Sequence, residues 1–208
     1  MRKAVSAALI RAFVEVSREN GPCGQVTVSR QPPFIKRCSC MSRLDSFIRR
    51  MTAQRACIDL AADLVQQLPG PVLELGLGNG RTYDHLRTSF PGREIFVFDM
   101  AVAAHPDCVP EARYLRLGDF RSTVPAYLLE GRPAAAMVHA DIGSSSKEDS
   151  KNLAARLSGH LRDILAIGGL LVCDQATPAP GLEPLPLPAG VDAGRYHIYR
   201  RFAQLFDR

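Results

Sequence analysis

Three glycines at alternate positions mark the most informative stretch of the sequence, VLELGLGNGRTYDHL, at residues 72–86. Gly76, Gly78 and Gly80 follow a short apolar run and precede a polar, helix-compatible segment. Glycine tolerates positive φ, and its lack of a Cβ lets another molecule approach the backbone. In parallel α/β sheets, ligands bind at such turns from a strand into the following helix. We therefore expect a ligand to lie against this turn.

Two classes of ligand fit a glycine-rich turn of this kind. The dinucleotide fingerprint G-x-G-x-x-G places a pyrophosphate at the N-terminus of the helix. Here Arg81 occupies the position of the third glycine, and the spacing is G-x-G-x-G with Glu74 before it. The chain also lacks a Tyr-x-x-x-Lys pair for hydride chemistry. A NAD-dependent oxidoreductase with a Rossmann fold is therefore the disfavoured alternative.

The stretch ELGLGNG resembles the first motif, E/D-x-G-x-G-x-G, of the class I S-adenosylmethionine-dependent methyltransferases. The resemblance extends over about residues 55–175. It implies an α/β fold with a Rossmann-like, doubly wound and mostly parallel sheet of the seven-stranded type. It also implies that S-adenosyl-L-methionine is the cofactor and that the protein transfers a methyl group.

The same resemblance assigns cofactor-binding roles to several residues. Asp99 ends the second expected strand, 19 residues after the last glycine. A carboxylate there would accept hydrogen bonds from both ribose hydroxyls, each contributing roughly 1.5–3 kcal/mol. Asp119 ends the third strand and would lie near the adenine amine, with Phe120 on the ring. The full cofactor-binding set is Glu74, Gly76, Gly78, Gly80, Asp99, Asp119 and Phe120.

Candidates for catalysis lie at the ends of the next strands and in the helix after the glycines. Asp141 ends the fourth expected strand, where it would orient or deprotonate the acceptor. His85 lies one turn into the helix and is the second candidate. Asp141 with Asp174 and Gln175 resembles the divalent-metal site of catechol-type O-methyltransferases, which would make them oxygen ligands for Mg²⁺. Gln175 replaces an Asn of that pattern, and we do not favour a metal.

The methyl acceptor is only partly constrained by the sequence. The chain contains no N/D-P-P-Y/F sequence, which is typical of methyltransferases acting on planar amino nitrogens. Few elements are added to the expected core, and substrate specificity normally resides in such additions. We therefore expect a small-molecule acceptor. The other alternative is a protein that binds S-adenosyl-L-methionine without transferring its methyl group.

Composition and charge restrict the partners. The net charge of +5 lies in residues 1–40, which hold seven of the 26 basic and two of the 21 acidic residues. The rest is neutral, so it lacks the basic surface that nucleic-acid binding requires. No run approaches the roughly 18 apolar residues that span a membrane. The six cysteines form no CxxC pair, which favours a cytoplasmic protein.

The pattern divides the chain at about residue 40. We expect residues 1–40 to be a basic, disordered N-terminal extension, and residues 41–208 to form a single methyltransferase domain. In the domain we expect one or two helices before Pro69, a helix after Gly80 and a long helix at 147–167 that Gly168–Gly169 would end. Strands are expected at 72–75, 94–99, 112–119, 134–141, 170–175 and 195–202.

Two connections look too short or too rich in proline for the usual crossover helices. About a dozen residues separate Asp99 from the third strand, and ATPAPGLEPLPLPAG fills residues 176–190. A missing helix would leave one face of the sheet open to water. We therefore expect the N-terminal helices, or a second subunit in a homo-oligomer, to cover that face.

Overall fold

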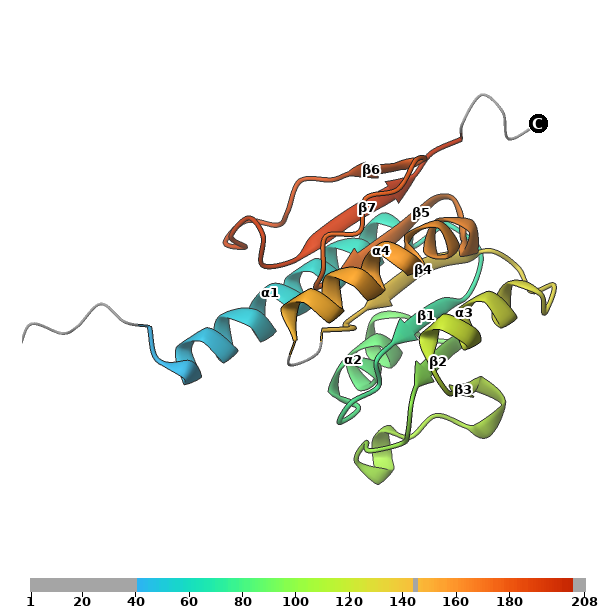
Figure 1. Ribbon diagram of the computed structural model, residues 1–208, viewed down its shortest axis with the longest axis horizontal. Helices are drawn as coiled ribbons and strands as arrows, with labels where there is room; N and C mark the ends of the chain where they lie inside the picture. Colours follow the sequence, from blue (N-terminus) through green and yellow to red (C-terminus); the bar gives the residue numbers. More distant parts are fainter. Residues whose placement is uncertain (1–40, 144–145, 204–208) are drawn as a thin grey trace, which may run out of the picture. The chain divides into compact units, whose positions relative to one another are not determined.

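A seven-stranded sheet in the order β3-β2-β1-β4-β5-β7-β6 forms the centre of the domain (Figure 1). This computed structural model describes residues 41–143 and 146–203, so the expectation for residues 1–40 lies outside the described residues. Neighbours from β3 through β5 pair in parallel, whereas β7 is antiparallel to both β5 and β6. The strands are β1 (Val72–Leu75), β2 (Ile95–Asp99), β3 (Leu115–Leu117), β4 (Ala135–Ala140), β5 (Leu165–Cys173), β6 (Leu182–Pro184) and β7 (His197–Arg201). The predicted α/β, mostly parallel fold is confirmed.

Helices cover both faces of this sheet, which explains why the central strands are apolar throughout. Alternate residues of β1 point to opposite faces, so Val72 packs with α1 and α2 while Leu73 packs with α3 and α4. The helices are α1 (Arg43–Leu64), α2 (Arg81–Ser89), α3 (Phe120–Leu128) and α4 (Lys147–Ile164). The N-terminal helix α1 thus covers a sheet face, as expected.

The two short connections contain no crossover α-helix. Between β2 and β3, a fully described segment, the chain forms the 3₁₀ helices Pro106–Cys108 and Ala112–Tyr114. After β5 the proline-rich segment forms β6, which pairs with β7. This strand was not among the expected ones, because an edge strand of three residues pairs on one side only and accommodates Pro184 at its end.

The glycine pair at 168–169 does not end a helix. Helix α4 ends at Ile164 and β5 begins at Leu165, so both glycines lie inside the strand. Gly168 has φ +85° and the β4–β5 register shifts beside the pair. A Cβ on Gly169 would lie 2.9 Å from the carbonyl oxygen of Ala135. The glycines therefore permit a bulge and a close strand approach, the other common use of glycine in strands.

Two further differences concern the segment around β3. The strand covers only Leu115–Leu117, because residues 112–114 form the 3₁₀ helix before it. Helix α3 follows, although Pro125 in its interior obscures the helical signal in the sequence. Its N-cap is Asp119, whose carboxylate accepts from the Arg121 N–H at 2.8 Å. Every described helix is too short or too polar to cross a membrane.

Candidate active site

The three glycines of the loop between β1 and α2 serve different purposes. All have positive φ: +100° at Gly76, +51° at Gly78 and +86° at Gly80. A Cβ on Gly76 would overlap the carbonyl oxygen of Asp141, and one on Gly80 would overlap the Cβ of Cys108. A Cβ on Gly78 would meet no atom within 4 Å. Gly76 and Gly80 therefore permit packing, while Gly78 faces open space.

That open space belongs to a cavity of about 380 Å³ at the carboxyl ends of β1, β2 and β4, which we call the glycine cavity. Helix α1 forms its roof, and the loops after the three strands form its floor. Its lining residues are Phe47, Arg50, Met51, Gln54, Gly76–Asn79, Arg81, Thr82, Asp99, Met100, Phe120 and Asp141–Gly143. Of the three glycines expected to lie against a ligand, Gly76 and Gly78 line this cavity, whereas Gly80 does not.

Asp99 lies on the floor of the glycine cavity, and backbone groups orient its carboxylate. Its Oδ2 accepts from the Gly78 N–H at 3.0 Å, and its Oδ1 accepts from the Met100 N–H at 2.6 Å. These bonds tie the end of β2 to the glycine loop. A carboxylate has about four lone-pair directions, so acceptor capacity is left for a ligand.

A second cavity of about 520 Å³ adjoins the first, with which it shares Met100, Phe120 and Ile142. We call it the β3 cavity because Asp119 and Phe120, which follow β3, line it. The Asp119 carboxylate accepts from the Arg121 guanidinium, and this bond lowers the pKa of Asp119 to about 2. The apolar side chains of Phe120 and Ile142 border both cavities, which suits a flat ring between them.

Asp141, the candidate catalytic residue, lies at the end of β4 and is held by helix α1. Its two carboxylate oxygens accept from Arg50 Nη2 at 2.6 and 2.8 Å, and Oδ2 also accepts from Gln54 Nε2 at 3.2 Å. Arg50 and Gln54 are one helical turn apart, so both reach the same point under the helix. The cavity therefore carries an adjacent positive and negative charge.

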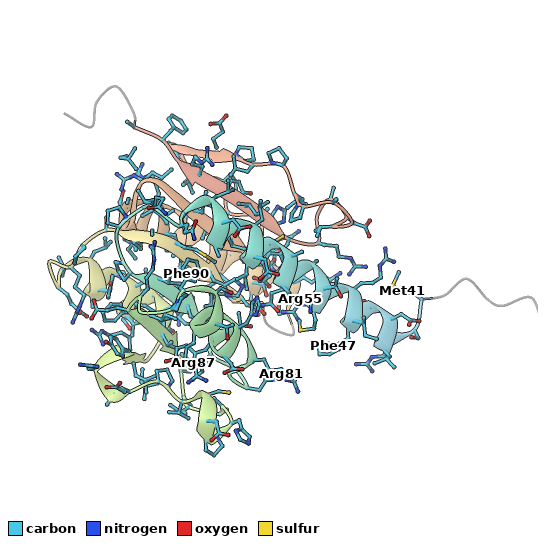
Figure 2. All side chains as sticks on the ribbon, turned by 180° about the vertical axis from the view of Figure 1, so that it is seen from behind. Met41, Phe47, Arg55, Arg81, Arg87 and Phe90 are labelled. Atoms are coloured by element: carbon cyan, nitrogen blue, oxygen red, sulfur yellow. The ribbon has the colours of Figure 1, made fainter. Side chains whose placement is uncertain are left out.

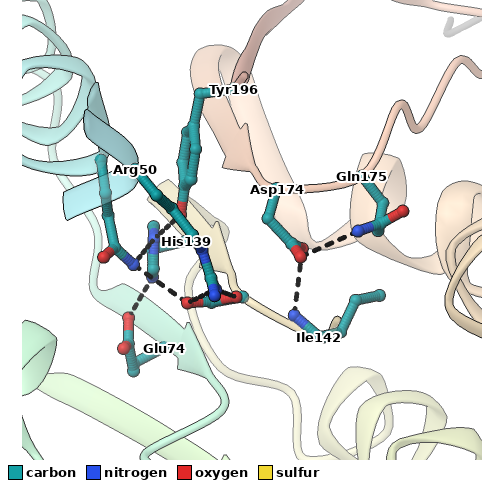
Figure 3. A network of polar contacts seen from close by, with 9 residues as sticks. Arg50, Glu74, His139, Ile142, Asp174, Gln175 and Tyr196 are labelled. Carbon is teal, nitrogen blue, oxygen red and sulfur yellow. Dashed lines mark hydrogen bonds and ion pairs between the residues drawn. The ribbon is translucent and has the colours of Figure 1, made fainter. Parts of the chain in front are cut away.

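A buried polar network lies beneath this ion pair (Figure 3). Glu74 and His139 face each other across β1 and β4, and both are 0% exposed. His139 Nδ1 lies 2.6 Å from Glu74 Oε2, and His139 Nε2 lies 2.6 Å from the Tyr196 hydroxyl. Gln54 Nε2 lies 3.4 Å from His139 Nε2. The network thus joins β1, β4, the start of β7 and α1.

The network is ionisable as well as buried. Burial opposes a charge on His139, but the attraction of the Glu74 carboxylate and the bond to it raise the pKa of the ring. Burial raises the pKa of Glu74 in turn. Its second oxygen, Oε1, has no hydrogen-bond partner among the described residues. Glu74, predicted to bind the cofactor, therefore lies beneath the glycine cavity rather than on its wall.

Asp174 and Gln175 lie at the end of β5, beside Asp141. Asp174 Oδ1 accepts from the Ile142 N–H at 3.2 Å, and Oδ2 accepts from Gln175 Nε2 at 2.9 Å. Burial, together with repulsion from Asp141, raises the pKa of Asp174. No group of three His, Cys, Asp or Glu side chains within the described residues has a metal-binding arrangement. Both oxygens of Asp141, one of the three residues considered as Mg²⁺ ligands, accept from Arg50.

His85, the second catalytic candidate, does not line the glycine cavity. Its Nε2 lies 2.7 Å from Asp59 Oδ1 on α1. It faces a neighbouring cavity of about 370 Å³ between α1 and α2, with Phe47 and Ile58. This placement gives no support to a role in methyl transfer.

Sequence reasoning missed the residues that α1 and the end of the chain contribute to the site. Arg50 and Gln54 lie in the segment expected to form one or two helices before Pro69, and Tyr196 lies in the expected strand 195–202. His139 lies within the expected strand 134–141, and both of its ring nitrogens have partners. The sequence did contain one signal for this network. Glu74 and His139 are ionisable residues in two apolar strands, and buried ionisable groups need a charged or hydrogen-bonding partner.

The comparisons with known proteins agree with this geometry. Residues 41–201 match a family described as S-adenosyl-L-methionine methyltransferase. The crystal structure of an S-adenosyl-L-methionine methyl transferase from Silicibacter pomeroyi DSS-3 shares 51% sequence identity, covers 77% of this chain and 98% of its own, and has a TM-score of 0.74. None of the curated proteins compared with the chain matches it.

A more distant structure shows the same fold. The MycE methyltransferase of the mycinamycin biosynthetic pathway, in complex with Mg, SAH and mycinamycin VI, has a TM-score of 0.50 at 13% identity. The match covers 75% of this chain and 48% of MycE. At this identity the likeness concerns the fold alone.

The chain belongs to the S-adenosyl-L-methionine methyltransferase family. It is therefore an enzyme whose cofactor is S-adenosyl-L-methionine. This membership decides against the oxidoreductase and against the non-catalytic binding protein that the sequence left as alternatives.

Proposed function

We propose that the enzyme methylates a small-molecule acceptor bound at the carboxyl ends of β4 and β5. The observation that carries this proposal is a further cavity of about 350 Å³, which we call the β5 cavity. It shares Arg50 and Gly143 with the glycine cavity, so its occupant would adjoin the methyl donor. A volume of this size is at the lower end of small-molecule pockets.

The donor fits the two larger cavities in one orientation. Asp99 accepts the ribose hydroxyls, and the adenine ring lies between Phe120 and Ile142 in the β3 cavity. The methionine end then lies over the glycine loop, where Asp141 faces its ammonium group and Arg50 faces its carboxylate. The neighbouring charges on Arg50 and Asp141 support this orientation, because they complement a zwitterion.

The donor contacts also depend on the close packing around the glycine loop. Gly78 provides the space in which the sulfonium end approaches the backbone. Phe47 and Met51 of α1 line the same cavity and give it an apolar wall on that side. The cofactor supplies an activated methyl group when bound.

The transfer itself requires alignment and the removal of one proton. A lone pair of the acceptor forms a bond to the methyl carbon while the carbon–sulfur bond breaks, and its electron pair stays on sulfur to give a neutral thioether. A hydroxyl or ammonium acceptor also loses a proton. Asp174 lines the β5 cavity, and its raised pKa favours it as the proton acceptor. Asp141, which is already bound to Arg50, orients the methionine end of the donor.

The test is methyl transfer from labelled S-adenosyl-L-methionine to cell extract separated into low-molecular-weight, protein and nucleic-acid fractions. The proposal expects enzyme-dependent label in the low-molecular-weight fraction. Asp174→Asn should reduce that rate by roughly 10²–10⁴-fold, the usual contribution of a positioned base. Label that enters only protein or nucleic acid would contradict a small-molecule acceptor.

A further inference from the structure

The β5 cavity holds two cationic side chains that have no partner among residues 41–143 and 146–203. Lys147 opens helix α4, and Arg195 lies in the loop just before β7. Among the described residues, neither side chain takes part in an ion pair or hydrogen bond. Arg195 is half-buried and Lys147 is exposed, and a half-buried guanidinium gains from a partner of opposite charge.

The third cation of the cavity differs from these two, since Arg50 is neutralised by Asp141 at 2.6 Å. The remaining carboxylate, Asp174, is also engaged elsewhere: one oxygen accepts from the Ile142 N–H and the other from Gln175. Asp174 therefore does not satisfy Lys147 or Arg195, although all three line the same space. The unmatched charge at this end of the cavity is positive.

We propose that the methyl acceptor carries an anionic group, a carboxylate or a phosphate, that Lys147 and Arg195 bind. This inference rests on the proposed function, because it assumes that the acceptor occupies the β5 cavity. Arg195 offers the planar fork that pairs with two anionic oxygens, and Lys147 supplies a compact charge. The two come from α4 and from the loop before β7, so they approach an anion from different segments.

The same arrangement sets the orientation of the acceptor. Its anionic end faces Lys147 and Arg195, and its nucleophilic end faces Asp174 and the boundary shared with the glycine cavity at Gly143. A second negative charge near Asp141 and Asp174 would be repelled, so the reacting atom belongs to a neutral or protonated group.

The first experiment is the labelled transfer reaction on the low-molecular-weight extract, with the products passed over an anion exchanger at neutral pH. The proposal expects the labelled product to be retained. Lys147→Gln and Arg195→Gln should each reduce the labelling rate at limiting extract by about tenfold, the loss of a charge-assisted bond. The control variants are Lys151→Gln, one turn further along α4, and Arg200→Gln on β7. Both should keep the labelling rate of the wild type.

The outcomes separate the two proposals. Labelled small molecules that flow through the exchanger would overturn the anionic acceptor and leave the small-molecule acceptor standing. Label confined to macromolecules, or no transfer at all, would overturn the proposed function. In that case the anion site is tested alone, by titrating inorganic phosphate into the protein saturated with S-adenosylhomocysteine. Phosphate binding that the Lys147→Gln and Arg195→Gln variants lose would support the site, and equal or absent binding would refute it.

Discussion

At the scale of single residues, the pair of Glu74 and His139 distinguishes this site most clearly. Both side chains are fully buried, and the ring of His139 also stacks on Tyr196 at 6.0 Å between centroids. Burying two ionisable groups is costly unless they satisfy each other. His139 contacts Tyr196 and Gln54, and Gln54 on α1 also donates to Asp141, so the pair helps to position the part of α1 from which Arg50 reaches Asp141.

The first prediction concerns the pH dependence of this pair. The folded protein raises the pKa of both His139 and Glu74, so it binds protons more tightly than the unfolded chain does. Stability from His139 is then complete below its ordinary pKa of about 6.5 and is lost as pH rises through the raised value. Glu74 acts in the same direction from about 4.5 upward.

We therefore expect the free energy of unfolding to fall more between about pH 5 and pH 8 in the wild type than in a Glu74→Gln, His139→Gln double variant. Urea denaturation at several pH values measures this difference. His105→Gln, at an exposed histidine, is the control and should follow the wild type. Parallel pH profiles for the wild type and the double variant would show that the pair does not titrate in this range.

The sequence predicted this pair only in part. It identified Glu74 as the acid of the glycine motif and placed a strand over residues 134–141, which contain His139, but it did not show that the two residues are adjacent. Their contact depends on the pairing of β1 with β4, which brings together two residues that are 65 positions apart in the sequence. Arg50 and Gln54 became site residues only because α1 packs over the same strand ends.

At the scale of elements, the loop from β1 into α2 combines a packing function and a binding function. Gly80 lies against Cys108 and Ala104 of the connection after β2, whereas Gly78 faces the glycine cavity. The sequence predicted the loop, its strand and its helix correctly, since turn glycines and periodicity are local signals. It missed the bulge in β5 because Gly168 ends a helix as plausibly as it bends a strand.

The second prediction separates the two glycines. Gly80→Ala should lower the free energy of unfolding by about 2–4 kcal/mol, because a positive φ and a steric overlap add up. Gly78→Ala should cost only about 1–2 kcal/mol, but its methyl group would enter the cavity and weaken S-adenosylhomocysteine binding by about tenfold or more. Urea denaturation and calorimetry measure the two effects. Equal losses of stability in both variants would contradict the assignment.

At the scale of the whole molecule, the compact unit begins at Met41, and the family match covers residues 41–201. Helix α1 supplies the roof of the glycine cavity, and its first turns extend past the sheet, with Met41 and Phe47 near that end (Figure 2). Leu44 and Ile48 in the same turns are 66% and 52% exposed. The described domain thus contains every residue that we assign to cofactor binding.

The third prediction concerns the division of the chain at this point. A variant that starts at Met41 should unfold at the same urea concentration as the full chain and bind S-adenosylhomocysteine with the same affinity. The reason is that the site and the core are built from described residues after position 40. If the shorter protein aggregates through the exposed side chains of α1, the prediction is wrong.

The most direct test of the account is a calorimetric titration of S-adenosylhomocysteine into the wild type and Asp99→Ala, with NADH as the control ligand. We expect the wild type to bind S-adenosylhomocysteine and not NADH. Asp99→Ala should weaken that binding by about tenfold or more, because the ribose loses its carboxylate partner. Asp107→Ala, an exposed carboxylate in the connection after β2, should bind like the wild type. Unchanged affinity in Asp99→Ala would place the cofactor outside the glycine cavity and contradict the account.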